Sequence, residues 1–313
     1  MTSGPQTRTG RILIPRQAPA TAEAASSAQA EATGAAQVPL PPEPSGLDIR
    51  QHLDGPGALL AGLANVIMQL SWAPVGYGVL ESRVTGGQLT RHPLKRARTT
   101  FTYLAVALLG TEDERRRYRD AVDTAHRQVR STPASPVRYN AFRSDLQLWV
   151  AACMYQGWVD VHTRLHGPMG PGLADAVQRH AARFGTTLQV REEAWPADQA
   201  AFEDYWQTAL RQVSIAPPVR DYLLGIMTLR ALPFPFRHGP SRPLVFWTTG
   251  FLPPALRAQL GLTWTDDDEA RFARWLRRLG AVLRRLPRTV RLFPLNLMMS
   301  DLRWRIRLGR RLV

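Results

Sequence analysis

The strongest constraint on this chain is a run of 26 residues without a charge, between Asp54 and Glu81. An apolar segment of that length either crosses a bilayer or forms the buried centre of a folded domain. This run includes Asn, Gln and Ser side chains and several glycines, and both flanking charges are acidic, so neither end has a basic membrane anchor. We therefore predict a buried core helix that ends near Trp72, where Pro74 breaks it.

Residues 1–46 differ in composition from the rest of the chain. They mix Ala, Pro, Ser and Gln with few large hydrophobic residues, so they cannot bury enough surface to offset the entropy lost on ordering. The sequence predicts a disordered tail over 1–46 and one folded domain over 47–313. Because no apolar run near the start is long enough for a secretory signal, we expect no export and a cytoplasmic protein.

Helical signals dominate the remainder of the chain. The pattern from Thr111 to Glu114 is a capping box that predicts a helix to about Val129, and a second box over 144–147 predicts a helix that closes at Gly167. Only 186–190 and 243–249 alternate like strands. The prediction is an all-α fold, with further helices over 172–184, 196–213, 219–229, 266–286 and 295–308.

The net charge of +15 is concentrated near the C-terminus. From Ala270 to Val313 there are 13 arginines against one acidic residue, Asp301. Helical spacing there predicts either an ordinary docked helix with an arginine-rich outer face or peripheral contact of 271–311 with an anionic membrane. No recognition-helix motif accompanies the charge, so we expect no nucleic-acid partner. The predicted buried stripe of this helix is Phe272, Trp275, Leu276, Leu279, Leu283 and Leu286.

Two neighbouring helices carry the polar residues of greatest interest. If the first begins near Lys95, then Arg96, Thr99 and Thr100 stand at i, i+3 and i+4 and form one polar patch on an apolar helix. On the second, His126 is the one ionisable group on an otherwise apolar face. Two interpretations of His126 stay open: a core histidine with both nitrogens bonded, or an axial ligand of haem iron.

Five segments in this order resemble bacterial members of the family that joins the MpaB-type oxygenases to the latex-clearing protein, a rubber oxygenase. The resemblance runs from about Gly46 to the C-terminus. It implies an all-α fold with a globin-like core, b-type haem, and oxidation of a hydrophobic substrate by dioxygen. The segments are ANVIMQLSWAPVGYGVLES, HPLKRARTTFTYLAVALLGT, AVDTAHRQVRS, YNAFRSDLQLWVAACMY and TRLHGP.

The resemblance also assigns residues. His126 falls on the proximal iron ligand, while Arg96 and Thr100 fall on the arginine and threonine of the distal motif, where Arg96 would offer a positive charge to a haem propionate. Thr99 stands where rubber oxygenases have a lysine above the iron, so this chain departs from them at that position. Glu81 lies near the acidic residue proposed as a base. Rubber cleavage itself is not expected, because rubber is extracellular.

Other candidates for chemistry rank lower. His162 and His166 have the i, i+4 spacing of zinc ligands but lack an obvious third ligand, and His166 is better explained as a helix C-cap. Cys153, the single cysteine, sits in an apolar run and is expected to be buried. There is no Gly-rich phosphate loop or GxSxG elbow.

The sequence thus predicts a haem b-dependent oxidoreductase, with a non-catalytic carrier of haem or a lipid-like ligand at a membrane surface as the alternative.

Overall fold

The computed structural model describes residues 48–82, 93–232 and 239–313, and within them the predicted all-α fold is confirmed. These residues contain no strand, and Arg130 and Asn140 form one isolated antiparallel bridge. The tail predicted over 1–46 lies outside the described residues. The globin-like arrangement of the helices stays a prediction.

The uncharged run folds as two helices, α2 (Gly55–Ser71) and α3 (Ala73–Leu80), bent by 106°. Trp72 lies between them with an extended backbone, and Pro74 occupies the first turn of α3, as predicted. No single helix among the described residues is long and apolar enough to cross a membrane. The bent α2–α3 pair passes that test by length and composition, yet α2 contributes buried side chains throughout its length.

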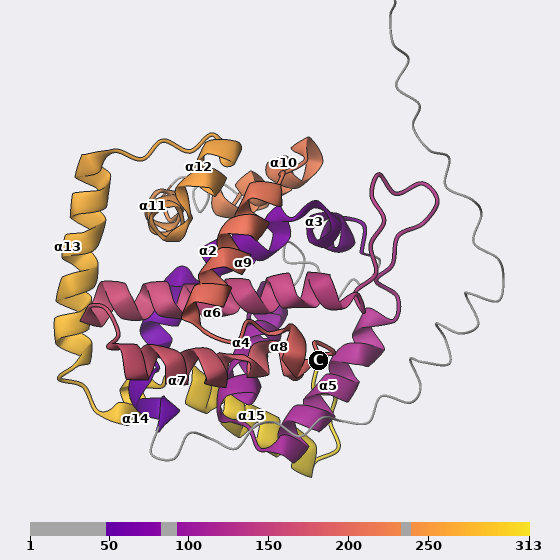
Figure 1. The fold of residues 1–313 in the computed structure, drawn as a ribbon, viewed down its shortest axis with the longest axis horizontal. Helices are drawn as coiled ribbons and strands as arrows, with labels where there is room; N and C mark the ends of the chain where they lie inside the picture. The colour runs from indigo at the N-terminus through magenta and orange to yellow at the C-terminus, as the bar shows by residue number, and fades with distance from the viewer. Residues whose placement is uncertain (1–47, 83–92, 233–238) are drawn as a thin grey trace, which may run out of the picture. The chain divides into compact units, whose positions relative to one another are not determined.

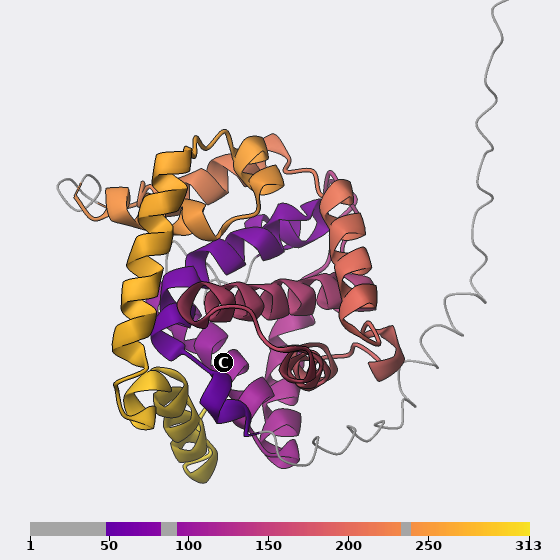
Figure 2. The ribbon, with the colours of Figure 1, turned by 60° about the vertical axis from the view of Figure 1, so that its left-hand side comes forward.

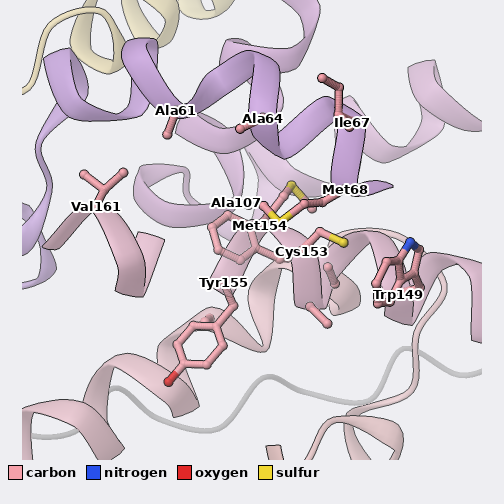
Figure 3. Close-up of a cluster of buried hydrophobic side chains, with 14 of the residues drawn as sticks. Ala61, Ala64, Ile67, Met68, Ala107, Trp149, Cys153, Met154, Tyr155 and Val161 are labelled. Atoms are coloured by element: carbon pink, nitrogen blue, oxygen red, sulfur yellow. The ribbon is translucent and has the colours of Figure 1, made fainter. Parts of the chain in front are cut away.

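The central partner of α2 is α6 (Ser144–His166), the longest helix of the described residues. Figure 3 shows Ala61 and Ala64 on the side of α2 toward α6, with Met68 and Met154 between the two helices. These residues and Cys153 are buried, and Cys153 is 0% exposed as expected. The small side chains of α2 let the two helices approach closely.

The start of α6 corrects one prediction. Ser144 lies inside the helix, Arg143 precedes it, and no side chain caps that end. The side-chain oxygen of Gln147, which would accept in a capping box, accepts instead from the backbone amide of Gln189, at 2.9 Å. The predicted end is right, because Gly167 closes the helix with a φ of 94° that favours glycine.

Two consecutive helices, α4 (Pro93–Leu109) and α5 (Glu112–His126), lead to the candidate site. The capping box predicted at the start of α5 is present: the Thr111 hydroxyl accepts from the Glu114 amide, and the Glu114 carboxylate accepts from the Thr111 amide. The helix ends at His126, three residues before the predicted end. His126 is therefore held at a helix terminus.

The remaining helices surround the central pair α2 and α6 (Figure 1). Residues 243–249, which alternate like a strand in the sequence, lie within a helix whose residues Phe246 and Trp247 pack against Phe272. The additional helices are η1 (Ile49–His52), α7 (Pro171–Ala181), α8 (Arg183–Thr186), η3 (Glu192–Ala194), α9 (Gln199–Gln212), α10 (Pro217–Met227), α11 (Ser241–Phe251), α12 (Pro254–Leu260), α13 (Asp266–Leu283), α14 (Arg288–Arg291) and α15 (Leu295–Arg307).

Helix α13 runs along one edge of the helical unit and is followed by α14 and α15 (Figure 2). It packs on α6 through Phe272, Leu276 and Leu283, as predicted. Trp275 and Leu286 were expected in the same buried stripe but are 53% and 36% exposed. The buried face of α13 is therefore narrower than the sequence pattern implied. It contacts α6 closely at Gly280 and α11 through Phe272.

Candidate functional site

Two adjoining cavities lie among α2, α4, α5 and α6. The first, called the His126 cavity, has a volume of about 370 Å³ and is bordered by α3, α4, α5 and α6. The second, called the inner cavity, has a volume of about 240 Å³ and lies between α2, α4 and α6. Both have largely apolar walls, which suit an apolar ligand. The residues that line both are Gln69, Arg96, Thr100 and Met154.

His126 borders the first cavity from the end of α5. Its Nδ1 atom is buried and has no hydrogen-bond partner among the described residues. Its Nε2 atom makes no hydrogen bond there either and is not enclosed, so this nitrogen is accessible from the cavity. Burial, and then the charge of Arg96, lower the pKa of His126 to about 4. The imidazole is therefore neutral at pH 7, the form that binds a metal ion.

Arg96 lies where the two cavities meet. Arg96 is an exposed residue that lines both cavities, and the protein atoms around its guanidinium lower its pKa by desolvation. The ion pairs of the described residues do not include Arg96, and the groups that act on its charge are the phenols Tyr222 and Tyr118. A cation held among apolar walls without a carboxylate is costly, so this position favours an anionic ligand group.

The two threonines of the polar patch differ in their bonding. Thr99 lines the His126 cavity, but its hydroxyl donates to the backbone oxygen of Arg96 at 3.0 Å, and its own backbone oxygen accepts from the Tyr118 hydroxyl at 2.8 Å. Thr100 lines both cavities, and its hydroxyl has no hydrogen-bond partner among the described residues. Thr100 is thus the hydroxyl that can serve a ligand without breaking a helix contact.

Glu81 lies at the end of α3, behind the cavity wall. Its carboxylate accepts from the Ser135 hydroxyl at 2.6 Å and from the Tyr139 hydroxyl at 2.7 Å. Tyr139 lines the His126 cavity, whereas Glu81 does not. The geometry makes Glu81 a positioning residue for Tyr139, and its assignment as a base stays a prediction. Tyr139 lies in the loop before α6 and was not singled out from the sequence, although it opens the segment YNAFRSDLQLWVAACMY that carries part of the family resemblance.

The far end of the inner cavity holds a second polar group. His52, Asp54 and His162 line it, and Asp54 lies 2.6 Å from Nε2 of His166. The sequence could not foresee that contact, because it joins the start of α2 to the end of α6. Among the described residues, no group of three His, Cys, Asp or Glu side chains is placed to hold a metal ion.

The residues around His126 fit haem chemically. A neutral imidazole with an accessible nitrogen suits iron, the unpaired Arg96 suits a propionate, and apolar walls suit the porphyrin. One feature departs from the usual pattern, since metal-binding histidines generally donate their other N–H to a partner. His126 Nδ1 has no such partner among the described residues.

The comparisons with known proteins agree with the family that the sequence resembles. Residues 49–285 match the family model described as "ER-bound oxygenase mpaB/B'/Rubber oxygenase, catalytic domain". The chain is 50% identical over 255 residues to the uncharacterized protein Rv2237 of Mycobacterium tuberculosis and, equally, to Mb2261 of Mycobacterium bovis. Each alignment covers 82% of this chain and 100% of the relative. No solved structure matches at a significant level. The chain therefore belongs to the family of mpaB and rubber oxygenase catalytic domains.

Proposed function

We propose that this protein is a haem b-dependent oxygenase that acts on a hydrophobic substrate with dioxygen. Membership of the family supports the oxygenase class. The observation that carries the haem proposal is a neutral, unpartnered imidazole at His126 in the same cavity as the unpaired cation Arg96. When bound, haem would supply the redox-active iron for chemistry with dioxygen.

The residues of the His126 cavity have separate roles in this proposal. His126 binds the iron through the nitrogen that faces the cavity. Arg96 binds a carboxylate of the cofactor, because its side chain lines both cavities and makes no ion pair among the described residues. Thr100 donates a hydrogen bond to a polar atom of the ligand. The Thr99 hydroxyl is not available for this role, because it donates to the backbone oxygen of Arg96. Tyr139, held by Glu81, forms the wall toward the loop before α6.

The inner cavity is the proposed substrate chamber. Its walls are largely apolar, and it shares Gln69, Arg96, Thr100 and Met154 with the His126 cavity. An apolar substrate part placed there lies beside the cofactor site without crossing bulk water. Apolar walls also exclude water, which strengthens the electrostatic interactions of Arg96.

The visible absorption spectrum tests the cofactor and its ligand. The chain is expressed with ample haem precursor and compared with His126→Ala and with the matched control His162→Ala. His162 also has a buried, unpartnered Nδ1, but it lines only the inner cavity. We expect a Soret band in the wild type and in the control that disappears in His126→Ala. A band that survives in His126→Ala would assign the ligand to another residue, and no band in the wild type would refute haem binding.

A carrier of haem or of a lipid-like ligand is the alternative function. The structural feature in its favour is Thr99, whose hydroxyl is bonded within α4 and leaves the position of the family's lysine without a basic group. Oxygen consumption with a hydrophobic alkene or a lipid extract separates the two functions. An oxygenase consumes oxygen above a free-haem blank and a carrier does not, while both show the Soret band.

A further inference from the structure

The exposed apolar residues of this protein are concentrated near its C-terminus. Of the twelve large hydrophobic side chains that are exposed in the described part of the chain, eight lie between 275 and 308. Surface hydrophobic residues that occur singly need no explanation, but a concentration of them marks an interaction site. We call this set the C-terminal surface: Trp275, Val282, Leu286, Val290, Phe293, Leu297, Trp304 and Leu308.

The spacing of these residues places them in rows along their helices. Trp275 and Val282 are seven residues apart on α13, which puts them on the same side of that helix, along the edge of the buried stripe that contains Phe272. Leu297 and Trp304 repeat the same spacing on α15. Each helix thus has one apolar face toward the core and a second apolar row that is exposed.

Positive charge surrounds these rows. Eight arginines of this segment are exposed and take part in no ion pair within the described residues. Asp301, the one acidic residue after 269, is bound to Arg98 and Arg305. Arginines also lie over both exposed tryptophan rings, Arg278 at 6.0 Å from the ring of Trp275 and Arg310 at 4.4 Å from that of Trp304. The unpaired arginines are Arg274, Arg277, Arg278, Arg284, Arg285, Arg307, Arg310 and Arg311.

We infer that the C-terminal surface of α13–α15 binds the surface of an anionic lipid membrane. Tryptophan and aliphatic side chains enter the interfacial layer of a bilayer, while neighbouring arginines bind anionic headgroups. A nucleic acid would explain the charge but leaves the apolar rows in water. The combination of both features therefore favours lipid.

The same segment also borders the inner cavity. Leu295 lines that cavity, and Arg291 lies 3.6 Å from the carboxylate of Asp54, which lines its far end. Arg291 further donates to the backbone oxygen of Gln51 at 2.8 Å. Membrane binding through α13–α15 would bring this end of the cavity toward the lipid. A role of this arrangement in taking up substrate from the lipid rests on the proposed hydrophobic substrate. The inference that the C-terminal surface binds a membrane does not rest on that proposal.

Vesicle sedimentation tests the inference on the full chain. Binding to phosphatidylcholine vesicles is compared with and without phosphatidylglycerol. We expect binding that requires the anionic lipid. The double variant Trp275→Ser/Trp304→Ser should bind about tenfold more weakly, since two large apolar side chains no longer enter the lipid. The variant Arg277→Gln/Arg278→Gln/Arg285→Gln should bind the anionic vesicles more weakly than the tryptophan variant does.

Matched controls change the same residue types elsewhere on the surface. Phe142→Ser removes an exposed aromatic ring, and Arg138→Gln/Arg191→Gln removes exposed arginines that have no ion pair among the described residues. Both controls should bind like the wild type, with thermal melts confirming the fold of every variant. No wild-type binding to the anionic vesicles would overturn the inference.

Two further outcomes bear on the nature of the partner. Binding that falls with the arginine variant but not with the tryptophan variant would also overturn the inference, because it would reduce the contact to charge alone. Retention of the wild type on a DNA column at physiological salt, without vesicle binding, would assign the surface to nucleic acid. Neither outcome would affect the Soret band, so failure here is distinguishable from failure of the proposed oxygenase function.

Discussion

Arg96 and His126 border the same cavity, and the positive charge of the first lowers the pKa of the second. They come from consecutive helices, α4 and α5, which turn back on each other at Gly110. Arg96 favours an anion and the neutral imidazole of His126 favours a metal ion. The two side chains repel each other when His126 is protonated, so an apolar cavity that holds both is unfavourable without a ligand. The haem proposed above would satisfy both, with its iron at His126 and a propionate at Arg96.

Acidification should destabilise the haem-free protein partly through His126. The pKa of this imidazole is 6.5 in the unfolded chain and about 4 in the folded protein. Below pH 6.5 the unfolded state therefore binds more protons, and stability falls as the pH falls toward 4. The full effect of His126 is about 3 kcal/mol.

Urea unfolding of the wild type and of His126→Leu, near pH 7 and near pH 5, measures this effect. The wild type should lose about 2 kcal/mol more than the variant over that interval. His52 and His162 titrate in both proteins, so their contributions cancel in the comparison. Equal losses in the two proteins would show that His126 is not buried in its neutral form.

Replacing Arg96 by Met should raise the thermal stability of the haem-free protein. The substitution removes a charge that no carboxylate of the described residues neutralises and keeps most of the side-chain volume. Because Arg96 is exposed and screened by solvent, the gain should be at most about 1 kcal/mol. The pKa of His126 should rise as well, although it should stay below 6.5 because burial is the larger cause of its shift.

Nuclear magnetic resonance of the His126 ring follows that pKa, and Arg127→Gln is the control. Arg127 is adjacent in sequence but exposed, and its charge is not among the causes of the shift. A destabilised Arg96→Met protein would contradict the prediction and give Arg96 a structural role.

The contact between Glu81 and Tyr139 should contribute measurably to stability. Tyr139→Phe removes a hydrogen bond to a carboxylate and should cost about 1.5–3 kcal/mol, with Glu81→Gln costing a similar amount. Because the two changes break the same bond, their effects in the double variant should be less than additive. Thermal or urea unfolding of the four proteins measures the coupling. Full additivity would indicate that the bond does not form in solution.

The close contact of α13 with α6 depends on Gly280. A Cβ atom at that position would lie 2.0 Å from the backbone oxygen of Leu165, and a backbone atom cannot move aside cheaply. We expect Gly280→Ala to destabilise the protein by about 3 kcal/mol. Gly172→Ala, in α7 with open space around it, should instead stabilise by about 0.5–1 kcal/mol. Urea unfolding compares the two, and a neutral Gly280→Ala would mean that α13 packs more loosely.

Local patterns in the sequence sufficed for much of the secondary structure. The capping box at Thr111, the break at Pro74 and the glycine that ends α6 each act within a few residues, so they can be recognised without the fold. The same holds for the polar patch of α4, because helical spacing alone places Arg96 beside Thr100. Where a local pattern competed with packing it failed: Gln147 bonds to Ala141 rather than capping α6, and residues 243–249 are helical.

Contacts between distant parts of the chain could be decided only by the tertiary structure. The sequence determined that His126 sits on an apolar helical face, but the folded arrangement alone left its Nδ1 unpartnered and brought Arg96 into its cavity. Tertiary packing likewise bound Glu81 to Tyr139 and left Trp275 exposed. The physical reason is that helix propensity and capping depend on neighbours in sequence, whereas burial, pKa and hydrogen-bond partners depend on neighbours in space.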